Sequence, residues 1–515
     1  MEADFGVLAL LPPVIAIVLA MITKQVLISL FVGIWIGATM AAGWNPIVGL
    51  KDSFGIHIFE ALGDTWQASV IIMTMLVGAF SAMIERGGGA YAFARSLRDK
   101  ITNRKQGQLI TWLGGVVIFF SDSTNPVVVG PVFRPITDTL KISREKLAYI
   151  VDSTSATLPA LLPFTAWGAF IIGLIATEFE GADYPVEPLV GFVRSMPFMF
   201  YVIGAILMVL IMILINKDFG PMKNAEKRAY QEGKVLGDNA QPIRAEVSID
   251  VPEGARPTIW NMVAPLIILV VLIFTMFLWT GGFPELGVLE AMGNANSMVS
   301  LVIAFFVASI LAGFFAVRAG VFDFKGAMNT WVGGIRQMLD AILILILAWA
   351  IGSAAAAVGT ADYIVSVTEH FLTPTMMYVA IFVAASITAF STGTSWGTFA
   401  IFMPIAIPLG IAIGAPVYPA IAAVVSGGIF GDHCSPISDT TVLSSMGSTS
   451  DHIDHVNTQL PYAITAAVAA VIGFVGAGIT GSAAVGLIAS LVALVVLALL
   501  LTSFFGEKAE EKKTQ

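Results

Sequence analysis

Stretches of about twenty apolar residues recur along this chain, and no other feature constrains its fold as strongly. A helix needs about 20 predominantly apolar residues to cross the hydrocarbon core of a bilayer. The segments that qualify are residues 7–22, 26–43, 67–85, 196–216, 258–280, 297–316, 337–358, 459–480 and 482–503. Two more, 147–177 and 418–449, are long enough to span a bilayer but are interrupted by polar and proline-containing runs. The pattern predicts an all-α polytopic membrane protein.

Two further stretches have the pattern of helical hairpins. Residues 107–140 and 375–412 each divide into two apolar arms of roughly 14–17 residues, which is short for a full crossing. The tips between the arms are polar, at Ser121–Asn125 and Ser391–Ser395. We therefore expect about 11 transmembrane helices plus two re-entrant hairpins, with broken helices at the membrane midplane.

The composition fits a membrane protein and excludes several other classes. Hydrophobic residues make up 57% of the chain and charged residues only 12%, whereas a soluble domain has about 25% charged residues. The net charge of −9 and the lack of a basic face argue against nucleic-acid binding. There is no Walker motif, so we expect neither ATP nor a cofactor to be used. The single cysteine, Cys434, excludes an internal disulfide.

The basic residues predict the orientation of the chain in the membrane. If the N-terminus is outside, nearly all Lys and Arg residues fall on one side, and only Lys51 and Arg194 fall on the other. Because Lys and Arg are enriched in cytoplasmic loops, we expect an external N-terminus and a cytoplasmic C-terminus in a bacterial inner membrane. Between residues 217 and 257 a mixed-charge stretch replaces the apolar pattern. We expect a solvated cytoplasmic linker there, with no role beyond connection.

The two halves of the chain resemble each other in order and spacing. Ile28-Ser29-Leu30 matches Val299-Ser300-Leu301, Phe120-Ser121 matches Phe390-Ser391, and Asp152 and Ser155 match Asp432 and Ser435. The predicted topology starts the two copies on opposite sides of the membrane, as in the inverted repeats of many secondary transporters. The expected organisation is a first span (1–25), a first repeat (26–216), the linker (217–257), a connecting span with an external loop (258–296), a second repeat (297–505) and a cytoplasmic tail (506–515).

Four aspartates lie in the interrupted segments: Asp122 at the first hairpin tip, Asp152 in the first discontinuous span, and Asp432 and Asp439 in the second. Intramembrane carboxylates mark functional sites by default, and carboxylate, hydroxyl and carbonyl oxygens are the ligands that hard cations such as Na⁺ prefer. Apolar surroundings favour a protonated carboxyl, whereas a nearby cation favours the ionised form. Na⁺ and H⁺ would therefore compete for the same oxygens, near Asp152 and near Asp432.

Each of these residues also has a plainer interpretation. Asp152 and Asp432 could be structural carboxylates that accept hydrogen bonds from broken helices, and Asp122 suits an N-cap as well as a ligand. His433 could shuttle protons or make a structural hydrogen bond. His452 and His455 have a spacing that a metal could use, but their position at a helix end favours a solvated cap. The hairpin tips add candidate ligands for an ion or a substrate: Ser123, Thr124, Asn125, Gly393, Thr394 and Ser395.

The chain resembles the NhaC family of Na⁺/H⁺ antiporters. The resemblance extends over about residues 20–505 and is carried by the run Gly431–Ser445 (GDHCSPISDTTVLSS) and by Asp451–Tyr462 (DHIDHVNTQLPY). Ser121–Asn125 and Asp152–Ala156 also look like the first-half pattern of that family. The resemblance implies an ion path through Asp152 with Ser153 and Thr154, Asp432 with His433 and Ser435, and Asp439 with Thr440.

The paired hairpin tips are similar, more remotely, to those of sodium–dicarboxylate transporters. This similarity implies an inverted-repeat fold, elevator-type motion and a homodimer. The second hairpin departs from the first, because Thr392 and Gly393 stand where the first has Asp122 and Ser123.

Two functions on this scaffold agree with the sequence, and both make the chain a transporter and not an enzyme. The leading hypothesis is secondary Na⁺/H⁺ antiport, with Na⁺ as the transported ion and alternating access of the elevator type. The alternative is Na⁺- or H⁺-coupled transport of a small organic solute, an amino acid or a carboxylate, because the hydroxyls of the tips could equally bind a substrate carboxylate. An intramembrane serine hydrolase and a passive channel are both disfavoured, since neither explains an inverted repeat.

Overall fold

The computed structural model describes residues 5–23, 25–63, 65–90, 92–93, 103–242, 252, 254–360, 363, 366–367 and 372–508. Within these ranges every regular element is a helix. Ten of the described helices are long and apolar enough to cross a membrane, or up to twelve if each bent pair counts as one span. The prediction of an all-α, multi-pass membrane protein is confirmed.

The first half of the chain follows the predicted segments closely. Its elements are η1 (Gly6–Leu10), α1 (Leu11–Thr23), α2 (Val26–Ala41), α3 (Pro46–Asp52), η2 (Ser53–Ile58), α4 (Phe59–Gly63), α5 (Thr65–Arg86), α7 (Arg104–Val117), α8 (Thr124–Thr139), α9 (Arg144–Ser155), α10 (Leu158–Leu161), α11 (Ala166–Gly181), α12 (Pro188–Ser195), η3 (Met196–Phe198) and α13 (Phe200–Ile215). The first predicted hairpin corresponds to α7 and α8, and the first discontinuous span to α9, α10 and α11.

The second half begins after two short helices, α14 (Gly220–Lys227) and η4 (Arg228–Glu232). Its elements are α15 (Trp260–Thr280), α16 (Val288–Gly293), α17 (Ser297–Arg318), α18 (Phe324–Gln337), α19 (Leu339–Ala357), α21 (Pro374–Thr392), α22 (Ser395–Ala412), α23 (Val417–Cys434), α24 (Asp439–Ser448), α25 (His452–Thr480) and α26 (Ala483–Phe504). The arms of the second hairpin, α21 and α22, have 19 and 18 residues. They are longer than the expected 14–17 residues, and each is long and apolar enough by itself to cross a membrane.

Side-chain caps fix where several of these helices begin. The Asn103 side chain accepts a hydrogen bond from the Gln106 amide at the start of α7, and Ser143 does the same for Lys146 in α9. Thr165 caps α11 through the Gly168 amide. Because a cap satisfies backbone N–H groups that have no partner within the helix, α11 can restart deep inside the protein after the chain has broken at α10.

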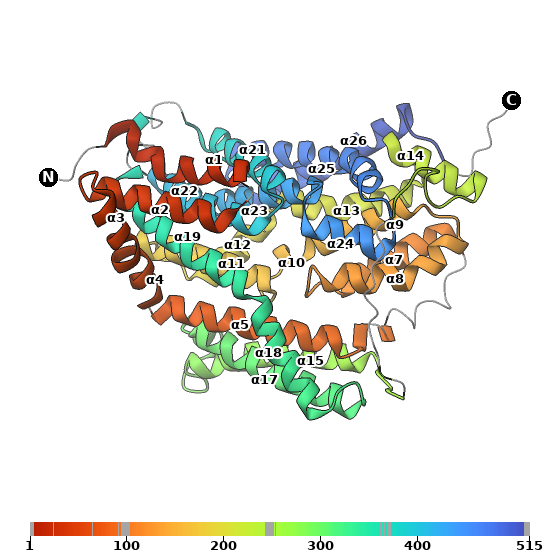
Figure 1. The fold of residues 1–515 in the computed structure, drawn as a ribbon, viewed down its shortest axis with the longest axis horizontal. Coiled ribbons are helices and arrows are strands. Elements are labelled where there is room, and N and C mark those ends of the chain that lie inside the picture. The colour runs from red at the N-terminus through yellow and green to blue at the C-terminus, as the bar shows by residue number, and fades with distance from the viewer. Residues whose placement is uncertain are drawn as a thin grey trace.

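The helices of the two halves exchange partners in a reciprocal way. In the lower part of Figure 1, α5 of the first half packs against α17 and α18 of the second, and α15 packs on α17. Likewise, α19 of the second half packs against α2 and η2 of the first, and α1 packs on α2. Each half therefore lends one helix to the other, which is the packing expected of two inverted repeats related by a pseudo-two-fold axis.

The hairpins and the broken helices show the same reciprocity. The hairpin α7–α8 packs on α9, and the hairpin α21–α22 packs on α23. Across the halves, α8 contacts α24, and α22 contacts α11. Gly130 of α8 lies against Gly447 of α24 so closely that a Cβ on Gly130 would stand 2.4 Å from the Gly447 carbonyl carbon. Small residues at such crossings let the backbones of membrane helices approach closely.

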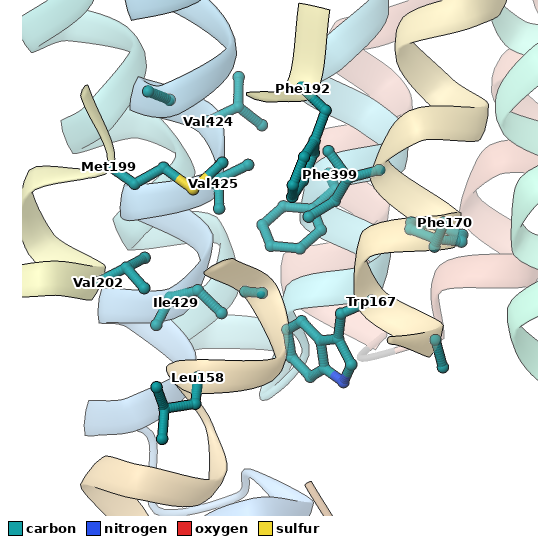
Figure 2. Packing of buried hydrophobic residues seen from close by; sticks show 14 of the residues in the cluster. Leu158, Trp167, Phe170, Phe192, Met199, Val202, Phe399, Val424, Val425 and Ile429 are labelled. Atoms are coloured by element: carbon teal, nitrogen blue, oxygen red, sulfur yellow. The ribbon is translucent and has the colours of Figure 1, made fainter. Parts of the chain in front are cut away.

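An apolar cluster supports the first helix break from one side. Figure 2 shows side chains from α10, α11, α12, α13, α22 and α23 that point toward one another, among them Leu158, Trp167, Phe399 and Ile429. All of these four are buried. Tight packing of this kind restricts the rotamers of neighbouring side chains, so the cluster holds the broken segment in place against the second half.

The linker between the halves is more structured than a solvated loop. Asp218 accepts hydrogen bonds of 2.6 Å from Lys146 of α9 and from Tyr462 of α25. Glu226 of α14 pairs with Arg104 of α7 at 2.5 Å, and both side chains are buried. The sequence pattern missed these contacts because each links charged residues that are distant in the chain. In Figure 1, α14 lies at the opposite end of the molecule from α3 and α4, and the linker clamps the two halves together there.

Candidate functional site

Both discontinuous helices break inside the protein among buried polar side chains. After α9 ends at Ser155, the chain forms α10 and then a turn that leads to the α11 cap. After α23 ends at Cys434, residues 435–438 lead into α24. Asp152, Ser153, Thr154, Asp432, His433, Ser435, Ser438 and Thr440 are all buried. In a membrane protein, irregular backbone at such depth persists only where protein groups or a cavity satisfy it.

Asp152 of α9 is held by side chains of the second half. Its Oδ1 accepts a hydrogen bond from Ser444 at 3.0 Å, and its Oδ2 accepts from Thr441 at 3.2 Å and from the Gln459 amide at 2.7 Å. Both carboxylate oxygens therefore have partners. Ser444 and Gln459 were not among the predicted site residues. The sequence signal for Gln459 is its position as a lone amide at the start of the apolar segment 459–480.

Asp432 of α23 is only half satisfied. Its Oδ2 accepts a hydrogen bond of 2.7 Å from Ser395 at the second hairpin tip. Its Oδ1 is buried and has no donor at full hydrogen-bond distance among the described residues, although the Ser438 hydroxyl lies close to the carboxylate. A buried carboxylate oxygen without a donor is costly unless a cation or a proton compensates it. Of the two matched aspartates, Asp432 is the one with an open coordination position.

His433 joins the two halves through both ring nitrogens. Nδ1 lies 2.8 Å from the Tyr201 hydroxyl of α13, and Nε2 lies 3.1 Å from Ser153 of α9. The nearest Asp152 oxygen is 3.9 Å from Nε2. The His433 ring is thus held between two hydroxyls that can each donate or accept a hydrogen bond. Through Ser153 it connects the end of α23 to the end of α9.

The hairpin tips meet around the start of α11. Asp122 accepts hydrogen bonds from Trp167 Nε1 at 2.9 Å and from the Ser123 amide at 2.7 Å. Trp167 in turn packs against Trp396 of the second tip, with ring centroids 5.1 Å apart. The cap interpretation of Asp122 differs from what is seen, since Ser121 and not Asp122 receives the Thr124 amide.

The other candidate residues of the tips have different surroundings. Asn125 is buried, with Nδ2 donating to the Gly115 carbonyl at 2.8 Å and Oδ1 without a hydrogen bond from the described residues. Thr124 donates to Ser121 at 2.8 Å. Gly393 ends α21 in the left-handed region at φ +70°, a conformation that glycine adopts without strain. Thr394 precedes α22 without capping it through its side chain.

Several predicted ligand hydroxyls are occupied by backbone partners. Ser435 donates to the Phe390 carbonyl at 2.8 Å, and Thr154 lies 3.0 Å from the carbonyls of Ile150 and Val151. Thr440 pairs with Ser438 at 3.0 Å. A hydroxyl that donates to a carbonyl still has oxygen lone pairs for a cation, so these contacts orient the oxygens without using them up.

Asp439 links the aspartates into one cluster. It lies close enough to Asp122, Asp152 and Asp432 to interact with each electrostatically. Asp439 is exposed and Asp122 half-buried, whereas Asp152 and Asp432 are buried. The described structure therefore gathers all four aspartates that the sequence singled out, with the accessible Asp439 at the edge of the group.

No three His, Cys, Asp or Glu side chains converge as a metal-binding group in the described ranges. A Na⁺ site in this cluster would need one carboxylate together with hydroxyl, amide and carbonyl oxygens, which are the oxygen ligands that hard cations take. Asp432, Ser395 and the broken backbone beside them offer that set.

A cavity of about 660 Å³ lies elsewhere between the two halves. It is lined by residues of α1, α5, α11, α19 and α22, and by His57 of η2. Three carboxyl-bearing residues border it, Glu60, Glu178 and Glu180, and its described lining includes no Lys or Arg. Such a lining offers no fixed positive charge to bind an organic anion.

The chain matches known transporters in sequence and in fold. A model of the Na⁺/H⁺ antiporter family matches residues 163–479. The chain belongs to this family. An uncharacterized protein of Haemophilus influenzae is 34% identical over 96% of this chain and 95% of its own length. The malate-2H⁺/Na⁺-lactate antiporter of Bacillus subtilis is 31% identical over 34% of this chain and 38% of its own length.

Two solved structures share the fold at low identity. MtrF of Neisseria gonorrhoeae, described among antimetabolite efflux pumps, has a TM-score of 0.55 at 14% identity and covers 94% of this chain and 96% of its own. The YdaH transporter of Alcanivorax borkumensis, with what its description terms an unusual topology, has a TM-score of 0.50 at 14% identity and covers 88% of each chain. The predicted resemblance to the NhaC family is confirmed, and the protein is a secondary transporter.

Proposed function

We propose that this protein exchanges Na⁺ for H⁺, with Na⁺ leaving the cell and H⁺ entering. The observation that carries the proposal is the buried Oδ1 of Asp432, which has no hydrogen-bond donor although the other oxygen is fixed by the second hairpin tip. A dehydrated Na⁺ or a proton would satisfy that oxygen, and each would exclude the other. Membership of the Na⁺/H⁺ antiporter family supports the same exchange.

Alternating access in this proposal is of the elevator type. The hairpins and broken helices pack mainly on one another and form one unit, and α5, α15, α17 and α18 form another layer. Movement of the first unit against the remaining helices would carry the Asp432 site between the two membrane faces. A homodimer in a bacterial inner membrane, with an external N-terminus, stays a prediction from the sequence.

The test uses proteoliposomes that contain only the purified protein, with no organic solute. A Na⁺ gradient is expected to drive saturable proton movement, and the apparent Na⁺ affinity is expected to weaken as the pH falls. The weakening approaches about tenfold per pH unit when one proton competes with one ion. Silence of vesicles that contain intact, inserted protein, or an affinity that does not change with pH, would contradict exchange at a shared carboxylate.

Coupled transport of a small organic solute is the second candidate. It is favoured by the Bacillus subtilis relative, whose name includes malate and lactate, and by a cavity large enough for a small metabolite. The acidic lining of that cavity disfavours an organic anion within it. If the proteoliposomes are silent without solute, the same vesicles should be screened with amino acids and small carboxylates.

A further inference from the structure

A chain of buried polar groups leads from Asp152 toward the accessible end of α25. Gln459 donates to Asp152 and accepts from His455 Nε2 at 3.0 Å. His455 Nδ1 lies 2.8 Å from Ser445 Oγ, and the same oxygen lies 3.0 Å from His452 Nδ1. His452 Nε2 ends the chain 2.7 Å from the Pro436 carbonyl.

The two ends of this chain are hydrogen-bond acceptors. The Pro436 carbonyl has no hydrogen to give, so His452 must carry a proton on Nε2. The orientation of the Gln459 amide is fixed because its NH₂ group faces both an Asp152 oxygen and the His433 carbonyl. Its Oε1 therefore points at His455, which must also be protonated on Nε2.

The middle of the chain then has one hydrogen too few. If both imidazoles are neutral and protonated on Nε2, both Nδ1 atoms are acceptors, and both face the Ser445 hydroxyl, which has a single hydrogen. That hydroxyl can also donate to the Thr441 carbonyl at 2.9 Å, so this carbonyl competes with the two rings for the one hydrogen. One Nδ1 lone pair is then left against an oxygen lone pair in a protein interior, where an unsatisfied contact is costly.

One additional proton removes the conflict. If one imidazole is protonated on Nδ1, it donates to Ser445, and the Ser445 hydroxyl donates to the Nδ1 of the other imidazole. Every contact along the line from Pro436 to Gln459 is then a donor–acceptor pair, and the Ser445 hydroxyl turns its hydrogen from the Thr441 carbonyl to the second imidazole. We propose that His452, Ser445 and His455 form a binding site for one shared proton, next to the aspartate cluster and separate from it.

Charged groups of both signs surround this site. The acidic groups near the site are Asp451 and Asp454 of α25 and Glu145 and Asp152 of α9. The basic groups are Arg134 of α8, Arg144 of α9, Arg228 of η4 and the imidazole of His433 on α23. Arg228 is paired with Glu145, and Arg144 with Asp138. Asp451, whose carboxylate accepts two amides at the start of α25, directly precedes His452 and favours a cation there.

The site is reachable and coupled to Asp152. His452 is half-buried and its neighbour Ile453 is 56% exposed, whereas His455 is buried. The proton can therefore enter at His452 and be shared inward. An amide does not pass protons readily, so Gln459 transmits the charge state instead: a cationic His455 polarises Gln459, which strengthens its donation to Asp152.

Nitrogen NMR of ¹⁵N-histidine-labelled protein tests the proposal without requiring transport. The chain has only five histidines, so single His→Gln variants assign each ring. Across about pH 5 to 9, we expect His452 and His455 to titrate together with the uptake of one proton between them. Ser445→Ala should uncouple the pair, and His57→Gln, which removes a ring in the distant cavity, should leave it unchanged.

Two rings that stay neutral throughout, or that each take up a proton independently of the other and of Ser445, would overturn the proposal. If His455→Gln does not fold, His452→Gln at the accessible end serves in its place. A failure of Na⁺/H⁺ exchange in vesicles would leave this titration in place, since proton binding to the pair does not depend on which solute is carried. If the protein exchanges Na⁺ for H⁺, the midpoint of the pH dependence of its transport rate should shift by about one pH unit in His455→Gln or in His452→Gln.

Discussion

Asp152 and Asp432 occupy matching places in the two halves but have different surroundings. Three donors from the second half satisfy both oxygens of Asp152, whereas Asp432 keeps one buried oxygen open. The difference arises because α24 and α25 supply three donors to Asp152, whereas the second tip supplies one serine hydroxyl to Asp432. We therefore expect Asp432 to be the better cation ligand, while the hydrogen bonds of Asp152 join the two halves.

Replacement of either aspartate by asparagine should abolish exchange. Asp432→Asn removes the negative charge that a cation requires, and Asp152→Asn removes a titratable group at the junction while keeping an acceptor for Gln459. For Asp432→Asn, Na⁺-driven proton flux should fall at least about a hundredfold, because removing one partner of a buried charge pair costs about 3 kcal/mol or more. Asp323→Asn, which keeps the cap of the Gly326 amide, is the control. Normal flux in both variants would remove these residues from the mechanism.

Among the elements, the hairpins are positioned by direct backbone contact with the broken helices. Gly130 of α8 touches Gly447 of α24, and a Cβ on Gly431 of α23 would lie 2.2 Å from the Ser386 carbonyl oxygen of α21. The linker contributes in another way, since its Glu226 and Asp218 form ion pairs with Arg104 of α7 and Lys146 of α9. Asp218 also accepts a hydrogen bond from Tyr462 of the second half. Close backbone contact with the broken helices therefore positions the hairpins, and ion pairs with the linker position the starts of α7 and α9.

Gly130→Ala should displace α8 from α24. The new Cβ would stand 2.4 Å from backbone, which cannot yield as a flexible side chain can. We expect a loss of about 1–3 kcal/mol in stability, measured as a lower melting temperature of the purified protein in detergent. Gly333→Ala on α18 is the matched control, because its Cβ would meet no atom within 4 Å. An unchanged melting temperature for Gly130→Ala would mean that α8 and α24 are not held together at this contact.

Glu226→Gln should weaken the clamp made by the linker. The substitution leaves Arg104 charged and buried without its partner, and breaking a buried pair in this way costs about 3 kcal/mol. Thermal melting monitors the loss. Glu232→Gln, at a side chain that is 58% exposed and 3.8 Å from Lys234, should have almost no effect, as expected of a surface pair. Equal effects of the two changes would exclude a stabilising role for the buried pair.

On the scale of the whole molecule, the hairpins and broken helices form one unit, and this unit borders the remaining helices, among them α2. The second hairpin meets that boundary at Gly397, where a Cβ would lie 3.1 Å from the Cβ of Val26 on α2. If the hairpin unit moves past α2 as proposed, this contact must open. We therefore expect a cross-link at this contact to arrest transport.

A disulfide between Val26→Cys and Gly397→Cys, in a Cys434→Ala background, should stop transport. Reduction of this disulfide should restore it. The Cβ atoms are close enough for a disulfide after a small shift. Gly476→Cys with Ala489→Cys, whose Cβ atoms would lie 3.5 Å apart between neighbouring helices α25 and α26, is the control and should leave flux intact. Full flux with a complete Val26–Gly397 cross-link would rule out sliding of α22 against α2.

Local pattern accounted for most of the elements and for the identity of the aspartates. Polar runs at Ser121–Asn125 and at Gly431–Thr441 marked the breaks, since such runs inside apolar segments are costly in a bilayer. Gln459, Ser444 and Trp167 were not anticipated as partners of these aspartates. Each is distant in the chain from the residue that it contacts, and a hydrogen bond between distant residues leaves no periodicity to detect.

The sequence by itself determined that this chain is a multi-pass helical transporter with two related halves, because hydrophobic length and polar interruption are properties of short segments. Only the tertiary structure decided that Asp152 is saturated while Asp432 is open, that His452 and His455 share one serine, and that the linker clamps both halves. These outcomes depend on where oppositely running helices cross. That geometry is set by packing between residues that are distant in the chain, and no single segment of the sequence specifies such packing.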